Sequence, residues 1–233
     1  ERTQKPMNVV GSFDPNEKVG PAGPGSEQYV RPGSLMPYTI YFENDPDLAT
    51  APAQEVLISD PLDPDLDWTT FQLTEIAFGD HVISVPAGLS YYSTTLDLRP
   101  EGEELLVEVE AGLDPITGEA FCRFTSLDPV TRYLPDDPLA GFLPVNDATG
   151  RGEGHLSYTI RAKDGLATDS QITGAASIVF DVNAPIITND ARNAIDADAP
   201  ESHVLALPAT VVGDTVTVSW TGSDAGSGVA AWD

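Results

Sequence analysis

The chain has 233 residues, of which 37 are acidic and 11 are basic, so its formal net charge is −26. This charge excludes nucleic acid as a natural partner and argues against an anionic membrane surface, because both require a basic face on the protein. No stretch approaches the 18 apolar residues of a membrane-spanning helix, whereas a hydrophobic content of 41% suffices for a folded core. The chain begins with Glu1 rather than Met, and we interpret it as part of a longer protein, so the missing signal peptide says nothing about export.

Short stretches of alternating apolar and polar residues recur along the chain and predict antiparallel strands with one buried face. Such stretches cover residues 38–43, 105–110, 156–161 and 216–220, and each ends at a Gly, Pro, Asn or Asp. No window of 12 residues carries an apolar stripe of helical period, and the many prolines would break a helix. The predicted fold class is therefore all-β, an antiparallel β-sandwich of immunoglobulin-like or Greek-key type.

A segment without alternation, dense in Asp, Ala and Pro, predicts a boundary near residues 194–202. The two strand-like runs beyond it, 203–208 and 215–221, are too short to bury a core alone. We therefore predict four parts: an extended N-terminal lead-in over 1–25, a β-sandwich module over 26–195, a linker over 196–202, and the truncated start of a second immunoglobulin-like module over 203–233.

Several motifs occur in a fixed order. Ser12-Phe-Asp-Pro-Asn-Glu-Lys18 is followed by Tyr38-Thr-Ile-Tyr-Phe-Glu-Asn44, and later by Ala176-Ser-Ile-Val-Phe-Asp-Val-Asn183 and Pro185-Ile-Ile-Thr-Asn189. Over roughly residues 12–195 this order resembles the conserved β-sandwich repeat of large secreted bacterial surface proteins. The resemblance implies an extracellular architectural module with no assigned enzymatic activity. The stretch after residue 199 resembles the start of a bacterial immunoglobulin-like repeat.

The residues that commonly carry catalysis are few and scattered. The three histidines, His81, His155 and His203, lie near no Ser or Cys in a nucleophile motif. The single cysteine, Cys122, excludes a disulfide framework and lies in a strand pattern typical of a small core residue. We therefore expect no enzymatic activity.

Acidic clusters on turns suggest Ca²⁺ as a structural cofactor, because calcium binds six to eight oxygens from carboxylates, amides and carbonyls. Asp outnumbers Glu, and no EF-hand loop occurs, so any site would be assembled from loops at the ends of the sheets. The alternative is that Asp and Asn simply form turns. The candidate ligands are Asp14, Asn16, Glu17, Asp181, Asn183, Asp45, Asp47, Asp60, Asp63, Asp65, Asp196, Asp198 and Asp224. The segment with Asp14, Asn16 and Glu17 and the segment with Asp181 and Asn183 form the favoured pair, since the first and last strands of a sandwich often end near each other.

Three alternatives concern ligands and covalent chemistry. The aromatic residues Trp68, Tyr91, Tyr92, Tyr133 and Trp232 suggest a carbohydrate- or partner-binding face. Seven Asp-Pro bonds could allow self-cleavage, although proline at a turn capped by Asp explains them more simply. Lys18 and Asn183 could form an isopeptide crosslink.

The leading hypothesis is a non-catalytic, calcium-stabilised module of a large extracellular bacterial surface protein or adhesin. Its partners would be adjacent modules of the same chain, and a carbohydrate or another surface protein is a further candidate. Neither nucleic acid binding nor membrane insertion is expected.

Overall fold

A computed structural model describes residues 16–207, 209–210 and 215–229. The helical structure of this part of the chain is a single 3₁₀ turn, η1, at Arg99–Glu101, and the remaining elements are strands. No helix within the described ranges is long and apolar enough to cross a membrane. The strands are β1 Glu17–Val19, β2 Leu35–Glu43, β3 Glu55–Pro61, β4 Leu66–Phe78, β5 His81–Ser84, β6 Tyr91–Asp97, β7 Leu106–Asp114, β8 Glu119–Leu127, β9 Glu153–Ala162, β10 Gln171–Gly174, β11 Ser177–Phe180, β12 Ile186–Ile187, β13 Ala191–Ala194, β14 Glu201–Val204 and β15 Trp220–Ser223.

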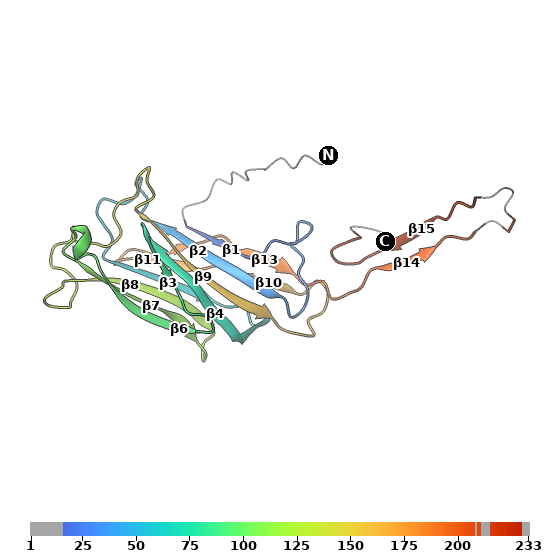
Figure 1. Ribbon diagram of the computed structural model, residues 1–233, viewed down its shortest axis with the longest axis horizontal. Coiled ribbons are helices and arrows are strands. Elements are labelled where there is room, and N and C mark those ends of the chain that lie inside the picture. The colour runs from blue at the N-terminus through green and yellow to red at the C-terminus, as the bar shows by residue number, and fades with distance from the viewer. Residues whose placement is uncertain (1–15, 208, 211–214, 230–233) are drawn as a thin grey trace.

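Two antiparallel sheets form the sandwich (Figure 1). The first sheet has the order β1-β2-β9-β4-β5 and the second the order β12-β11-β3-β8-β7-β6. Neighbours in the sheets come from distant parts of the chain, since β2 pairs with β9 and β3 pairs with both β8 and β11. The prediction of an all-β antiparallel sandwich is confirmed.

The predicted alternation decides which side chains enter the core. Tyr38, Ile40 and Phe42 of β2 are buried, and so are Leu156 and its alternate neighbours along β9. A cluster of phenylalanine rings joins the two sheets, with centroid distances of 5.3 Å between Phe42 and Phe124 and 5.4 Å between Phe124 and Phe142. Such ring pairs contribute beyond their buried area, so the two inner faces form one continuous core.

Two segments differ from the predictions. Residues 17–19, inside the predicted N-terminal lead-in, form strand β1 of the first sheet, because a buried lysine holds this segment to the core. The predicted strand over 215–221 begins only at Trp220, and the side chains of Val216 and Val218 are exposed rather than buried.

The two-stranded hairpin of β14 and β15 projects from one end of the sandwich (Figure 1). All four residues of β14 are exposed, and the apolar side chains of Val204 and Trp220 face solvent. The division into a main module and a second, truncated one stays a prediction.

Candidate functional site: a buried polar network between the sheets

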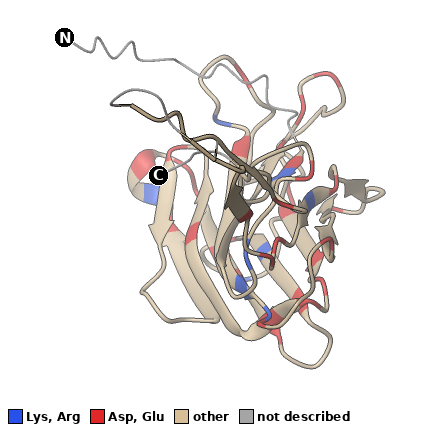
Figure 2. Ribbon diagram, turned by 90° about the vertical axis from the view of Figure 1, so that its right-hand side faces the viewer, with Lys and Arg blue, Asp and Glu red and all other residues tan. Residues whose placement is uncertain are grey.

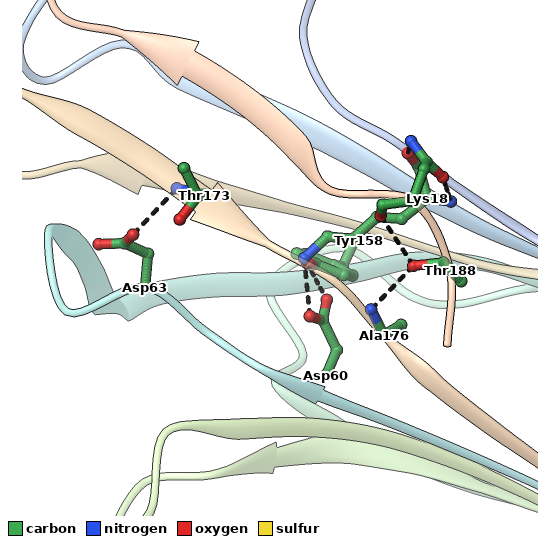
Figure 3. A network of polar contacts seen from close by, with 8 residues as sticks. Lys18, Asp60, Asp63, Tyr158, Thr173, Ala176 and Thr188 are labelled. Carbon is green, nitrogen blue, oxygen red and sulfur yellow. Dashed lines mark hydrogen bonds and ion pairs between the residues drawn. The ribbon is translucent and has the colours of Figure 1, made fainter. Parts of the chain in front are cut away.

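A lysine and an aspartate form an ion pair in the core between the two sheets. Lys18 Nζ donates a hydrogen bond to Asp60 Oδ1 at 2.7 Å, and the two side chains are 3% and 0% exposed. The hydroxyl of Tyr158 donates to Asp60 Oδ2 at 2.6 Å. Figure 3 shows Lys18 and Tyr158 converging on the Asp60 carboxylate, so both of its oxygens are engaged inside the protein.

Strand alternation places each of the three groups. Lys18 is the central residue of β1, and its neighbours point outward. Asp60 follows Val56 and Ile58 on the inward face of β3, where a third apolar residue would be expected. The network therefore joins the first strand of one sheet to a central strand of the other.

Aromatic rings surround the ion pair. Tyr38 stacks on Tyr158 at a centroid distance of 5.4 Å, and Phe71 packs on Tyr158 at 5.0 Å. The Lys18 ammonium lies 5.0 Å from the centroid of the Tyr38 ring, within the range of a cation–π contact. Burial, reinforced by the Asp60 carboxylate, raises the pKa of Tyr158 well above its ordinary value, so its hydroxyl stays a hydrogen-bond donor.

A second set of polar contacts holds β1 from its other side. Asn189 Oδ1 accepts the backbone N–H of Lys18 at 2.9 Å, and its Nδ2 donates to the Lys18 carbonyl at 3.0 Å. Next to it the buried Thr188 hydroxyl accepts the backbone N–H of Ala176 (Figure 3). The opening motif that ends at Lys18 and the closing motif that ends at Asn189 thus meet in space.

The favoured metal pair is only partly described. Asp14 lies outside the described residues, and Asn16 and Glu17 lie at the start of β1. Asp181 is exposed, and its Oδ1 accepts the backbone N–H groups of Gln54 and Glu55 at 2.8 and 2.9 Å. Asp181 therefore caps the start of β3 in this structure.

Many aspartates of the molecule cap turns, and the candidate ligands Asp45, Asp63, Asp196 and Asp224 are among them. In ten cases an Asp side chain accepts the backbone N–H two residues further on, which is the contact of an Asx turn. Five of these residues precede proline, which has no N–H of its own to satisfy. The ten are Asp45, Asp63, Asp67, Asp97, Asp114, Asp128, Asp137, Asp147, Asp196 and Asp224.

Some of the candidate ligands do come together. Asn183 lines a cavity of about 100 Å³ with Glu43, Asn44 and Asp45. At the base of the hairpin, Asp196 Oδ2 accepts the backbone N–H of Ser227. Within the described ranges, however, no three His, Cys, Asp or Glu side chains form a group that could hold a metal ion.

The remaining candidate ligands have partners or lie in solvent. Asp60 is held by Lys18 and Tyr158, and Asp47 is exposed. The backbone N–H groups of Asp65 and Asp198 are bound by the preceding aspartates of their turns. Figure 2 shows Asp and Glu on loops and strand ends around the molecule, with few Lys and Arg among them.

The crosslink between Lys18 and Asn183 does not fit this geometry. Asn183 is exposed at the far end of β11, whereas the Lys18 side chain points inward to Asp60. The buried acidic residue that faces Lys18 is Asp60, and its residue type does not distinguish it from the other aspartates within residues 60–67 of the sequence. The sequence signal for its burial was its position in the strand alternation, since position 60 lies on the same inward face as 56 and 58.

The candidate catalytic residues lie apart. His155 Nε2 is 3.0 Å from Glu75 Oε1 on the outer face of the first sheet, and His203 is exposed on β14. Cys122 is fully buried, and burial raises the pKa of its thiol. His81 Nε2 lies 3.4 Å from Glu101 Oε2 beside an open cleft of about 310 Å³.

The predicted aromatic face is dispersed as well. Trp68 is half-buried, with its Nε1 donating to the Asp63 carbonyl, and its ring lies against Gly118. Tyr91 and Tyr133 are exposed, and Trp232 lies outside the described residues.

The fold and the network define an antiparallel β-sandwich domain whose apolar core contains a buried polar network between the sheets. The family described as "Domain of unknown function (DUF7619)" matches residues 14–85 and 142–194, more than half of the chain, and the chain belongs to this family. Lys18, Asp60, Tyr158 and Asn189 all lie inside the matched segments. A search of curated proteins finds no significant match.

Solved structures with similar folds come from bacterial adhesins and pilins. The C-terminal domain of the AgI/II polypeptide BspA from Streptococcus agalactiae is 14% identical, with 90% of this chain and 61% of that chain covered and a TM-score of 0.45. Domains D2 and D3 of the major pilin SpaD from Corynebacterium diphtheriae are 19% identical, with coverages of 81% and 54% and a TM-score of 0.39. The collagen-binding domain of a Staphylococcus aureus adhesin is 9% identical, with coverages of 79% and 99% and a TM-score of 0.39. The chain spans less than two thirds of the first two chains.

Proposed function

We propose that this chain is a non-catalytic structural module of a large bacterial surface protein or adhesin, and that it spaces or displays neighbouring domains outside the cell. The observation that carries the proposal is the anchoring of β1, the first strand of the sandwich. Its lysine side chain is bound to Asp60 in the opposite sheet, and its backbone is bound to the side chain of Asn189.

A module that transmits tension needs such an anchor. β1 has three residues and lies at the edge of its sheet, so its ladder with β2 is short. A pull on the N-terminal side of β1 would open these few hydrogen bonds one after another. Pulling Lys18 out of the core also leaves the buried Asp60 carboxylate without its partner. This costs far more free energy than breaking a backbone hydrogen bond.

Single-molecule stretching of the chain by its ends tests the proposal. Lys18→Met should lower the force at which the sandwich unfolds, because the chain loses its anchor between the sheets. Lys163→Met is the matched control, since Lys163 is an exposed lysine whose Nζ donates to the Pro64 carbonyl. Equal unfolding forces for the two variants would refute a role of the network in bearing tension.

A structural role for calcium is the finer part of the proposal. It is supported by the net charge of −26, which repels itself in a compact state, and by the oxygens that Glu43, Asp45 and Asn183 bring to one cavity. An ion bound only by the folded state adds about 2.7 kcal/mol at a hundredfold excess over its Kd. Melting should therefore shift upward in millimolar calcium relative to EDTA, and magnesium should be a poor substitute. Identical melting curves together with metal-free purified protein would refute the role.

A binding module is the second candidate function. The cleft near His81 carries Phe142 as an apolar wall and Arg151 and Glu101 as polar groups, which is a composition suited to a polar ligand such as a carbohydrate. A glycan array probed with the protein tests this candidate, with His81→Ala as the comparison. Binding unaffected by the substitution would place any ligand elsewhere.

A further inference from the structure

We propose that Lys18 and Asp60 condense into an intramolecular amide bond that covalently joins the two sheets. The two groups are already in contact, since Lys18 Nζ lies 2.7 Å from Asp60 Oδ1. The inference concerns the chemistry of this pair and does not depend on the function proposed above.

The ammonium form of Lys18 is poorly satisfied at this site. An ammonium group has three N–H donors, yet Asp60 is the one hydrogen-bond acceptor of Lys18 Nζ within the described part of the chain. Its other neighbours are the Tyr38 ring and Gly174, whose added Cβ would lie 2.9 Å from Nζ. An uncharged nitrogen with a single N–H needs fewer acceptors than an ammonium, so it suits this enclosure, where the described residues offer the ammonium only Asp60 and the face of the Tyr38 ring.

The product would leave fewer polar hydrogens without a partner than the ion pair does. Asp60 Oδ2 would become the amide carbonyl oxygen and would keep the hydrogen bond from the Tyr158 hydroxyl. The amide N–H would replace the ammonium beside the face of the Tyr38 ring, where a weak N–H···π contact is available. The charged pair would be replaced by a neutral group in the same space, which removes the desolvation cost of two buried ions.

The reaction balances without an oxidant or a cofactor. A proton passes from the Lys18 ammonium to Asp60 Oδ1, which gives an amine and a carboxylic acid. The amine nitrogen attacks Cγ of Asp60 while the Tyr158 hydroxyl stabilises the negative charge that develops on Oδ2. A second proton moves from the nitrogen to Oδ1, the Cγ–Oδ1 bond breaks, and Oδ1 leaves as water. Burial keeps the two groups in contact and excludes the solvent that would hydrolyse the bond.

The bond would close a ring between positions 42 residues apart in the sequence. It would connect β1, an edge strand of the first sheet, to β3 in the second sheet. Tension applied at β1 would then pass directly to β3, and residues 18–60 would remain unstretched.

The intact mass of the purified chain under denaturing conditions tests the proposal. The wild type and the Lys163→Met control should each weigh one water molecule less than calculated from their sequences, whereas Lys18→Met should have its full calculated mass. Proteolysis followed by tandem mass spectrometry should yield a branched peptide that joins residues 18 and 60. Tyr158→Phe should increase the unlinked fraction, with circular dichroism confirming that the variant is folded.

A full calculated mass for the folded wild type would overturn the proposal and leave a plain ion pair. A loss of water without the branched peptide would also overturn it, because cyclisation at another aspartate gives the same mass change. Neither outcome decides the stretching experiment, so the amide bond can be refuted while the proposed structural function still stands.

Discussion

Replacing Asp63 by Asn separates the role of an acidic residue in a turn from a role in metal binding. Asp63 Oδ1 accepts the N–H of Asp65 at 2.8 Å, and Oδ2 accepts the N–H of Thr173 at 2.9 Å. An asparagine has one acceptor oxygen and one NH₂ donor, so it can satisfy only one of these two N–H groups. The backbone N–H that is left over would face the NH₂ group of the asparagine and would lose its hydrogen bond.

The expected loss follows from this single hydrogen bond. A hydrogen bond to a charged group contributes about 1.5–3 kcal/mol, and the partial exposure of Asp63 and Thr173 lowers the expected loss to roughly 1–2 kcal/mol. For a domain of this size each kcal/mol lowers the melting temperature by about 2–4 °C, so Asp63→Asn should melt roughly 2–8 °C below the wild type.

Asp45→Asn is the matched control. Asp45 Oδ1 accepts one N–H, that of Asp47, and the asparagine oxygen can keep this hydrogen bond. Both variants lose one negative charge, so their overall charge effects cancel in the comparison. In EDTA, Asp45→Asn should stay within about 0.5 kcal/mol of the wild type.

Thermal unfolding followed by circular dichroism, first in EDTA and then in calcium, measures the difference. The turn role predicts that Asp63→Asn is already the less stable variant in EDTA. Equal melting of the two variants in EDTA would refute the reasoning. A loss of stability of Asp63→Asn relative to the wild type that arises only in calcium would identify Asp63 as a metal ligand.

Three further predictions use other parts of the sandwich. The hydrogen bond from the Arg99 side chain lowers the pKa of Asp97 to about 2. This contact should therefore stabilise the fold at pH values above the ordinary carboxyl pKa, and its contribution should be lost as the pH falls from about 4 to about 2. An NMR titration of the Asp97 carboxyl group can follow this change. Gly118→Ala should destabilise the fold by about 1–3 kcal/mol more than Gly88→Ala, because both glycines have positive φ, but only at Gly118 would a Cβ meet an indole ring, at 2.3 Å. Cys122 should react with a thiol reagent only in denaturant, since it is fully buried, and rapid labelling of the native protein would contradict the core packing.

The sequence alone was sufficient to predict much of the local structure. Alternation predicted the buried faces of β2, β7 and β9, because the side chains of a strand point to opposite sides whatever it pairs with. The turn explanation for the many Asp-Pro pairs was also available, since an aspartate can bind the N–H that follows a proline. Residues 216–220 carry the same alternation without forming a buried strand, because alternation cannot supply the partner sheet.

The tertiary structure decided the site. Nothing local distinguishes Asp60 from the acidic residues at 63, 65 and 67 except its phase along β3, and Lys18 lies 42 residues away in the opposite sheet. The two side chains meet because the sheets pack face to face, and this packing depends on pairings such as β2 with β9 and β3 with β8 that join distant parts of the chain. A buried charge is tolerated only beside its partner, so the core position of Asp60 has a physical explanation only once the sandwich has brought Lys18 and Tyr158 to it.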